Sequence, residues 1–327
     1  MNSQNVTFQN HNMNWPMAAL VIYPDNFDEQ LSYPTVISVH PFGSCKEQTS
    51  GAIYGKALAQ AGYVVIAFDA SFQGESGGMP RYLEDPSQRV EDVSRAIDYA
   101  ISLPFVDSNC IAGIGVCGGG AYIINAALTE KRLKAVVGIT PVNLGRLFRE
   151  GFSEYNPLGV LTAMAEQRTM EAKGETLQVN ELLSPSLDVA TELGLTERDV
   201  FEATDYYKTA RGQSEGGATK MLFSNAQRIL SWDAFAFTET LLTQPVMTVI
   251  GKNIGAFGAY RDGHEVYGKA VASKDRQLVE LDGISHYDLY DKDEPVALAM
   301  AQILPFLEKH LLNNTNSVKY VIRDSAG

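Results

Sequence analysis

The sequence predicts an α/β protein with a doubly wound, mostly parallel sheet and a helical insertion. Short apolar runs typical of strands alternate with amphipathic helical stretches between residues 18 and 142, and the alternation resumes at residue 246. The run at residues 63–69 is apolar almost throughout, as expected of a strand that is buried on both faces of a parallel sheet. Alternation of this kind indicates a sheet covered by helices on both faces.

The periodicity of the apolar residues predicts the individual elements in order. Before the insertion, strands are predicted at residues 18–23, 34–40, 63–69, from 110 into a Gly-rich turn, and at 134–140. Helices are predicted at residues 46–62, at 89–103 and from Gly118 onward. After the insertion we expect a strand at 246–251, a helix at 263–273, a strand at 277–281 and a helix at 294–312.

Residues 143–243 carry no strand pattern and contain several helical stretches, at 158–172, 196–209, 218–230 and 234–242. A structureless loop of this length would be unusual within a compact domain, so the segment predicts a helical cap packed over the sheet. The expected organisation is a core formed by residues 17–142 and 244–312, the cap, and terminal extensions at 1–16 and 313–327. Residues 318–322 are compatible with either an edge strand or a disordered tail.

The Gly-rich turn has the pattern Gly115-x-Cys117-x-Gly119 between a predicted strand and a predicted helix. A sharp strand-to-helix turn forces its central residue into a strained conformation, and a Cβ on either flank would collide with the turn. The pattern is that of a nucleophile elbow with Cys in the place of Ser. The helix that starts near Gly118 is expected to lower the pKa of the Cys117 thiol through its N-terminal dipole.

A thiol nucleophile needs a base, and His286 is the candidate because it follows the last predicted strand in a loop, Gly283-Ile284-Ser285-His286. The other four His residues lie in a terminal segment, at strand or helix ends, or on a surface helix: His11, His40, His264 and His310. The backbone N–H of Gly118 is one predicted oxyanion donor. The second comes from Phe42 or Gly43 in the loop after the strand that ends at His40.

The acid that would orient His286 is left open by the residues. The loop after the strand at 246–251 contains no carboxylate through residue 258. Asp262 is the favoured candidate, with Asn253, Glu265 and Asn143 as alternatives. A Cys–His pair depends less on a carboxylate than a Ser–His pair does, because a low thiol pKa already favours the ion pair.

Composition excludes several classes of function. The net charge is −13 and the pI is about 4.9, which argues against nucleic acid or an anionic membrane surface as a partner. The three Cys residues form no disulfide framework and no Cys-x-x-Cys metal pattern. We expect no metal and no cofactor. Residues 1–16 lack the apolar core of a signal peptide and no apolar run could span a bilayer, so we expect a cytoplasmic protein. A homodimer is left open.

Four blocks resemble a known family: HPFGSCKEQ after the second strand, FDASFQGESGG after the third, GVCGGGAY at the turn, and GISHYDLYD near the end. Over residues 18–312 the chain resembles the α/β-hydrolase superfamily, in the dienelactone-hydrolase-related branch with a Cys nucleophile elbow. The resemblance implies the doubly wound fold, a Cys117–His286 pair and an oxyanion hole at Phe42 and Gly118. It further implies hydrolase chemistry, with some relatives transferring polyketide acyl chains.

These observations predict a cofactor-independent hydrolase of a small-molecule ester, thioester or lactone that forms an acyl-enzyme on Cys117. An acyltransferase using the same site and a catalytically silent binding protein are the alternatives. An apolar substrate chamber is expected under the cap. Its predicted substrate-binding residues are Phe148, Tyr206, Tyr207 and Trp232, and further apolar cap residues such as Leu144, Leu147, Phe152, Tyr155, Leu158, Leu161 and Met164 add to it. A small polar substrate would instead implicate Arg81, Arg89 or Arg211.

Overall fold

The computed structural model describes residues 2–151 and 156–312. The predictions for residues 318–322, Phe152 and Tyr155 therefore lie outside the described residues. Within the described ranges, no helix is both long enough and apolar enough to cross a membrane.

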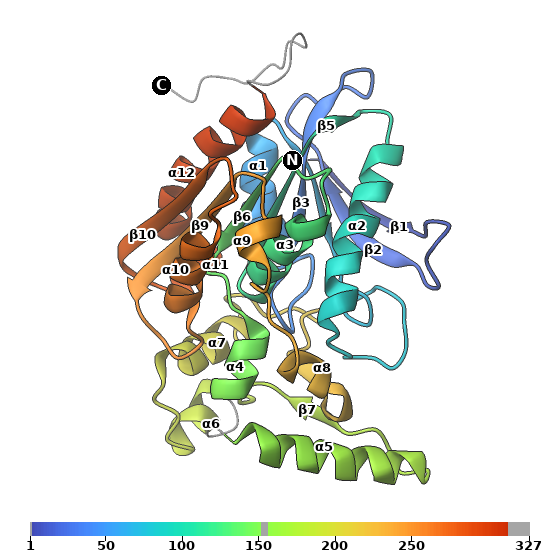
Figure 1. Ribbon diagram of the computed structural model, residues 1–327, viewed down its shortest axis with the longest axis vertical. Helices are drawn as coiled ribbons and strands as arrows, with labels where there is room; N and C mark the ends of the chain where they lie inside the picture. The colour runs from blue at the N-terminus through green and yellow to red at the C-terminus, as the bar shows by residue number, and fades with distance from the viewer. Residues whose placement is uncertain (1, 152–155, 313–327) are drawn as a thin grey trace.

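One eight-stranded sheet forms the centre of the molecule, with strand order β1-β2-β4-β3-β5-β6-β9-β10 (Figure 1). The strands are β1 (Ser3–Phe8), β2 (Met17–Ile22), β3 (Tyr33–Val39), β4 (Val64–Phe68), β5 (Val106–Val116), β6 (Ala135–Ile139), β9 (Val246–Asn253) and β10 (Arg276–Ser285). All neighbours from β4 to β10 pair in parallel, whereas β1 and β2 run antiparallel at one edge. The predicted α/β fold with a mostly parallel sheet is confirmed.

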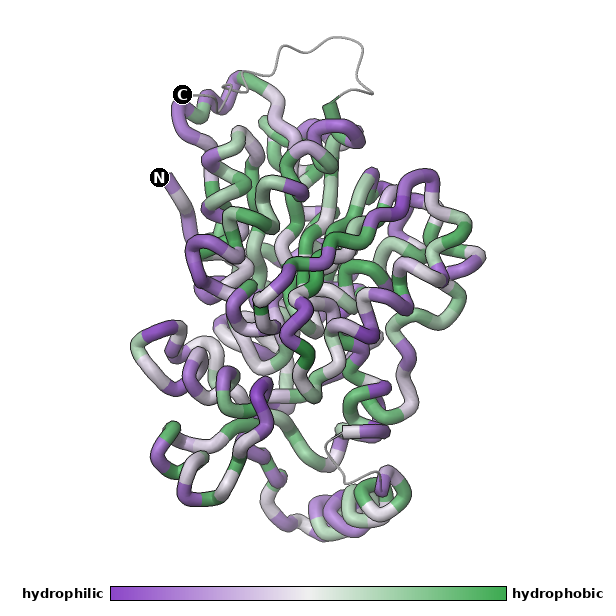
Figure 2. The backbone as a smooth tube through the Cα atoms, turned by 90° about the vertical axis from the view of Figure 1, so that its left-hand side faces the viewer, coloured by the Kyte–Doolittle hydropathy of each residue, from purple (hydrophilic) through white to green (hydrophobic). Residues whose placement is uncertain are grey.

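Helices flank the sheet: α1 (Lys56–Gln60), α2 (Pro86–Ser102), α3 (Gly118–Thr129), α9 (Thr238–Leu241), α10 (Ala259–Lys269), α11 (Asp288–Asp291) and α12 (Asp293–Leu311). Helix α2 begins where the sequence favours a start, because the Asp85 side chain accepts from the N–H groups of Ser87 and Gln88 and Pro86 is the first helical residue. Strands β3, β4 and β6 are almost completely buried, and Figure 2 shows predominantly hydrophobic segments running through the centre of the molecule. The apolar core therefore holds rigidly the strand ends from which the site residues project.

Two elements of the core differ from the prediction. The helix expected at 46–62 is a π-helical segment, Thr49–Gly55, followed by the short α1, and residues 46–48 precede it in a turn. Strand β1 forms within the segment predicted as an N-terminal extension. It is mostly exposed and polar at the sheet edge, so it carries no apolar periodicity, and it is secured by pairing with β2 and by Phe8 stacking on Tyr99.

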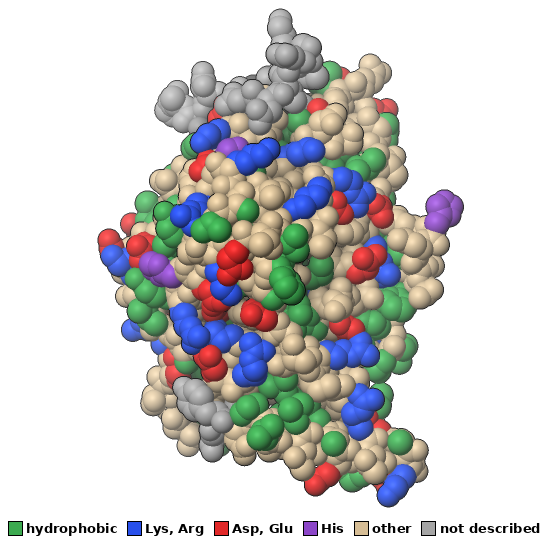
Figure 3. All heavy atoms as spheres, viewed as in Figure 1, with side chains coloured by type: hydrophobic (Ala, Val, Ile, Leu, Met, Phe, Trp, Pro, Cys, Tyr) green, Lys and Arg blue, Asp and Glu red, His purple; other side chains and the backbone are tan. Residues whose placement is uncertain are grey.

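The segment between β6 and β9 is termed the insertion below. It contains α4 (Leu144–Glu150), α5 (Pro157–Ala172), α6 (Leu187–Glu192), α7 (Arg198–Lys208), η2 (Phe223–Asn225) and α8 (Gln227–Leu230), and it ends in α9, which packs beside α3 and α10. It also contains a two-stranded ribbon of β7 (Val179–Glu181) and β8 (Lys220–Leu222), which the sequence did not predict because each strand is only three residues long. In Figure 1 the insertion from α4 to α8 lies below the sheet, with α5 lowest, whereas α9 lies over the sheet. Hydrophobic side chains are exposed on this lower part of the surface (Figure 3). Leu158 on α5 is 75% exposed.

Candidate active site

Cys117 occupies the sharp turn between β5 and α3 in a strained backbone conformation. Its φ is 55° and its ψ is −122°, a region that non-glycine residues rarely adopt. A Cβ on Gly115 would lie 2.1 Å from the carbonyl oxygen of Gly119, and a Cβ on Gly119 would lie 2.3 Å from that of Val39. Both flanking glycines are therefore sterically required. Strain of this kind persists where the surrounding structure enforces it, which is common at functional sites.

The end of β6 lies beside this turn. The Cys117 N–H donates to the carbonyl of Ile139 at 2.9 Å, and the Cys117 carbonyl accepts from the N–H of Val142 at 3.0 Å. These two bonds bracket Thr140, whose φ of 42° is also in the left-handed region and is unusual for a β-branched residue. Two strained residues on adjacent strand ends thus form the base of the site.

His286 follows β10 and is buried against this base. Its Nδ1 lies 2.9 Å from Thr140 Oγ1, whereas its Nε2 has no hydrogen-bond partner in the described part of the chain. The Tyr290 ring lies 5.5 Å from the imidazole, and its hydroxyl also interacts with the Cys117 sulfur. Tyr290 thus touches both Cys117 and His286. A His held at Nδ1 with a free Nε2 is suited to accept a proton.

Asp262, the favoured acid in the sequence analysis, is engaged elsewhere. Its Oδ1 accepts from Arg146 Nε at 2.6 Å, and its Oδ2 accepts from Arg146 at 2.8 Å and from the Asn143 N–H at 2.7 Å. This ion pair anchors α4 of the insertion to α10 of the core. The assignment of Asp262 as the partner of His286 is corrected, because Thr140 holds the Nδ1 position.

The three alternative partners of His286 are also bonded to other groups. Asn253 donates to the carbonyl of Gly283, Asn143 caps α4, and Glu265 pairs with Lys269. The sequence analysis did not predict Thr140, although its position at the end of the predicted strand 134–140 was a usable signal. Carboxylates and amides alone do not identify the group at Nδ1, because that group is a hydroxyl.

Burial dominates the electrostatics of the pair. Desolvation raises the pKa of the Cys117 thiol to about 11, although the Tyr290 hydroxyl and the Gly118 backbone N–H act in the opposite direction. Desolvation also lowers the pKa of His286 to about 3. The Gly118 N–H at the helix N-terminus lowers the thiol pKa as expected, but loss of water outweighs this effect, so the net pKa is raised rather than lowered. The resting pair is therefore a neutral thiol and a neutral imidazole.

This electrostatic state predicts slow alkylation of Cys117 in the free protein. The thiolate is the reactive form, so the rate with iodoacetamide should keep rising between pH 7 and pH 10 without a plateau. Mass spectrometry of the modified peptide measures that rate. A plateau below about pH 7, as expected for a preformed thiolate–imidazolium pair, would contradict the neutral resting state.

The predicted oxyanion donors lie together. A Cβ placed on Gly118 would be 3.4 Å from the amide nitrogen of Phe42, so the first turn of α3 and the loop after β3 approach closely. Gly43 has a φ of 69°, and its carbonyl accepts from the N–H of Thr219 in the insertion at 3.0 Å. The insertion therefore braces the loop that carries Phe42.

An apolar pocket opens above Cys117, with an empty volume of about 470 Å³ including its mouth. Its lining comes from both the core and the insertion: Phe42, Cys117, Val142, Leu144, Leu147, Leu182, Leu183, Tyr207, Thr219, Phe257, Tyr287 and Tyr290. None of these side chains is charged at neutral pH. The hydroxyls of Tyr207 and Tyr290 lack well-aligned hydrogen-bond partners among the described residues, so they can bond to a ligand.

Comparison with known proteins identifies the family. The model of the X-Pro dipeptidyl-peptidase (S15) family matches residues 16–222. The chain belongs to the S15 family. Among its relatives, the uncharacterized protein YcjY of Escherichia coli (strain K12) is 35% identical over 312 residues, which is 95% of this chain and 100% of that protein. The thiohydrolase aneE of Aspergillus aculeatus is 32% identical over 117 residues, 36% of each chain.

Solved structures share the fold of this S15-family chain. The crystal structure of hypothetical protein PA2218 from Pseudomonas aeruginosa matches with a TM-score of 0.83 and 28% identity, covering 95% of this chain and 94% of that one. The α/β hydrolase GrgF from Penicillium sp. sh18 matches with a TM-score of 0.77 and 20% identity, covering 95% and 99%. The S15-family chain is thus a hydrolase with the α/β-hydrolase fold.

Of the four predicted substrate-binding residues, Tyr207 is in the pocket lining of the S15-family chain, and the described structure places the other three outside it. Phe148 packs edge-to-face on Phe42, behind the pocket wall. Tyr206 packs on Tyr290, and Trp232 packs on Tyr122 of α3. These three rings are packing residues because they join the insertion to the core. From sequence alone, apolar residues that face a ligand and those that face the core look the same.

The three Arg residues considered for a polar substrate are also bonded to protein groups. Arg81 donates to the carbonyls of Gly74 and Ser76, and Arg89 donates to His40 beneath the oxyanion loop. Arg211 pairs with Asp291 and donates to the Tyr287 carbonyl, which ties the insertion to the loop that carries His286. Each of the three guanidinium groups is thus engaged by protein groups in the described structure.

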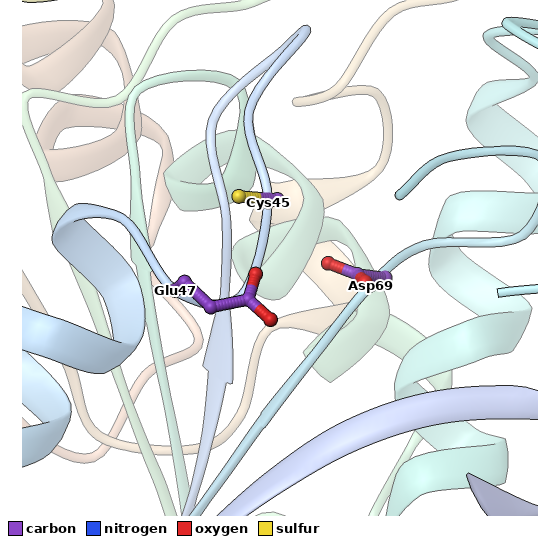
Figure 4. Close-up of side chains that lie close together, drawn as sticks. All are labelled: Cys45, Glu47 and Asp69. Atoms are coloured by element: carbon purple, nitrogen blue, oxygen red, sulfur yellow. The ribbon is translucent and has the colours of Figure 1, made fainter. Parts of the chain in front are cut away.

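Cys45, Glu47 and Asp69 are not among the pocket-lining residues, and their side chains lie close together (Figure 4), with potential metal-ligand atoms within 4.8 Å of one another. The Lys46 ammonium lies among these groups, 2.9 Å from Asp69 Oδ2, 2.5 Å from Glu47 Oε1 and 2.6 Å from Glu75 Oε2. The buried lysine pairs with all three carboxylates and offsets part of their negative charge. The cluster is therefore a salt-bridge network that secures the start of the loop after β3.

Proposed function

We propose that this protein is a cofactor-independent hydrolase of small, uncharged acyl esters, thioesters or lactones, and that it uses Cys117 as a nucleophile in the manner of the dienelactone-hydrolase branch. The proposal rests on a strained Cys117 at the base of an apolar pocket, connected through Thr140 to a buried His286 whose Nε2 has no hydrogen-bond partner among the described residues. Covalent acyl transfer requires a nucleophile and a base, and a thiol with an imidazole nitrogen that can accept its proton supplies both.

The first half of the reaction forms the acyl-enzyme. As the Cys117 sulfur attacks the carbonyl carbon, its proton passes to His286 Nε2, and the backbone N–H groups of Phe42 and Gly118 stabilise the oxyanion. The tetrahedral intermediate then collapses with cleavage of the C–O or C–S bond of the substrate. The leaving alcohol or thiol takes the proton from His286, so the imidazole is neutral again.

The second half releases the acid. His286 deprotonates a water molecule, which attacks the thioester on Cys117, and the returning proton regenerates the thiol. In each half of the reaction His286 is protonated, and therefore positively charged, only until it passes the proton on. This suits a pocket in which burial keeps the resting imidazole neutral.

The uncharged lining favours a neutral acyl group over a peptide N-terminus. A dipeptidyl-peptidase must bind a substrate ammonium, and the twelve described residues that line the pocket include no carboxylate. A thioester is a reasonable substrate because aneE is named a thiohydrolase. Transfer of the acyl group to an alcohol or amine is the alternative fate of the same intermediate. Product analysis with and without an added acceptor separates the two.

A series of acyl chain lengths tests the proposal. Each additional CH₂ buried in the pocket should contribute up to about 0.8 kcal/mol, or about a fourfold rise in kcat/KM, until the pocket is full. The measurement is kcat/KM for p-nitrophenyl esters and acyl thioesters of increasing length, with an X-Pro p-nitroanilide alongside. A profile that falls beyond acetyl, or cleavage of the anilide alone, would contradict the proposed substrate class.

One variant pair connects this profile to the pocket. Leu183→Trp adds bulk to the lining and should move the optimum to a shorter chain. The control is Leu158→Trp, because Leu158 is 75% exposed on α5 and outside the pocket lining. The control should leave the length profile unchanged.

A further inference from the structure

The loop after β9 carries no acid of its own, and the insertion brings carboxylates to it. The Glu197 side chain accepts from the N–H of Ala256 at 2.9 Å, and Asp199 Oδ2 accepts from the N–H of Phe257 at 2.7 Å. Glu202 accepts from Ser285 Oγ at 2.7 Å, immediately before His286. These three residues flank or belong to α7, so one segment of the insertion contacts both loops that adjoin the catalytic pair.

Asp199 differs from its two neighbours in depth and in its unused oxygen. The side chain is 1% exposed, and its Oδ1 has no hydrogen-bond partner among the described residues. Asp199 lines a small polar pocket together with Thr140 and His286. A Cβ on Gly255 would lie 2.0 Å from Asp199 Oδ1, so only a glycine at that position allows the carboxylate this close to the loop.

The hydrogen bond from Thr140 to His286 leaves one donor for this carboxylate. With Nε2 free to accept the thiol proton, His286 Nδ1 carries the hydrogen and donates it to Thr140 Oγ1. The threonine O–H must then point to another acceptor. Asp199 Oδ1 is an unsatisfied acceptor that lines the same pocket.

We propose that Asp199 of the insertion is a positioning residue for the reaction proposed above: through Thr140 Oγ1 it stabilises His286 when that imidazole becomes protonated. This inference rests on the proposed function. No proton leaves His286 toward Asp199; the carboxylate contributes charge and orientation only. The insertion thereby supplies the acid that the loop after β9 lacks, and the catalytic site is complete only when α7 is docked.

The charged groups around Asp199 set its resting state. Glu197 and Glu202 oppose its ionisation and Arg198 favours it, while Cys117 and Tyr287 face it from the core. Desolvation is the largest effect and raises the pKa of Asp199 to about 7. A carboxyl with a raised pKa contributes stability that is fully present below its unfolded pKa of about 4 and is lost as the pH rises through about 7. At pH 8 the ionised Asp199 therefore opposes folding.

The test uses the full chain and two readouts, kcat on the best ester and the pH dependence of kcat. Asp199→Asn keeps the size of the side chain and removes the charge. If Asp199 supports protonated His286, kcat of the variant should fall at least about tenfold with little change in KM. The wild-type kcat should rise as Asp199 ionises around pH 7, and this rise should be absent from the variant. A purely structural carboxylate would leave that step of the pH profile in place.

Matched variants keep the outcome interpretable. Glu197→Gln changes a carboxylate that contacts the same loop but does not line the polar pocket, and it should leave both readouts within about twofold. The Tm of Asp199→Asn at pH 8 should not fall, because the variant removes a charge that opposes folding. Should that variant fail to fold, Gly255→Ala displaces the carboxylate sterically and should lower kcat in the same way.

The two proposals fail in different ways. An unchanged kcat in Asp199→Asn, or in Gly255→Ala if that variant has to serve, overturns the role of Asp199, as does a rise around pH 7 that persists in Asp199→Asn. If the wild-type chain hydrolyses no ester or thioester, the proposed function fails and the role of Asp199 in it falls as well.

Discussion

We expect Cys117→Ala to lower kcat/KM for an ester or thioester by at least about 10⁴-fold, because loss of a nucleophile leaves only binding and the oxyanion donors to act on the substrate. The sulfur lies at the base of the pocket, and the backbone N–H groups beside it are independent of the side chain. The variant should therefore still bind substrate, with a Tm close to that of the wild type. Steady-state kinetics and a thermal melt measure the two quantities.

Cys45→Ala is the matched control for this variant. Cys45 is also a buried thiol, but its Sγ contacts Ser214 Oγ at 3.3 Å in the insertion and it is absent from the pocket lining within the described residues. It should retain nearly full activity. Equal activity of Cys117→Ala and the wild type would refute the nucleophile. Absence of turnover in every variant and in the wild type would favour the silent binding protein.

The second large effect concerns stability. Arg146→Leu should lower the free energy of unfolding by about 3–5 kcal/mol, because it leaves the Asp262 carboxylate buried without its partner. Desolvation already raises the pKa of Asp262 to about 6 with the arginine in place, which indicates how costly the isolated charge would be. Urea denaturation at pH 8 measures the change.

Two comparisons test whether the Arg146–Asp262 pair is structural. One distinguishes it from an exposed ion pair, and the other tests whether Asp262 takes part in catalysis. Arg261 lies on the same helix as Asp262 and forms an exposed ion pair with Glu150 of α4. Arg261→Leu breaks this pair and should lower the free energy of unfolding by only about 0–1 kcal/mol. The double variant Arg146→Leu with Asp262→Leu should regain most of the lost stability, since both charges are gone. If the double variant folds and loses kcat as severely as Cys117→Ala, Asp262 acts on His286 after all.

Local sterics and periodicity made much of the core predictable. The continuous apolar runs form β3, β4, β5, β6 and β9. The pattern Gly115-x-Cys117-x-Gly119 forms the strained turn, because a Cβ at position 115 would collide with the Gly119 carbonyl and a Cβ at position 119 with the Val39 carbonyl of β3. The placement of His286 in the loop after the last strand followed from element order alone. Edge strand β1 and the ribbon of β7 and β8 were not predictable, since neither has an apolar period long enough to detect.

The partners of the site residues depended on contacts between distant segments. Asp262 lies close in sequence to the loop where an acid is expected, yet Arg146 of the insertion binds it, and Thr140, which follows β6, takes its place beside His286. Asp199 lies in a stretch of sequence with no motif at all. Which polar group meets which is decided by long-range packing, and one sequence records no such pairing.

The sequence by itself therefore determined the parallel strands of the core, the turn that strains Cys117, and the order in which candidate nucleophile and base follow each other, because apolar runs, a glycine pattern and element order record these features directly. The tertiary structure decided the ionisation of the pair, the identity of the group at His286 Nδ1, and which aromatic residues line the pocket. The physical reason is burial: removal of water raises the pKa of Cys117 and lowers that of His286, and burial arises only when the insertion and the core pack together.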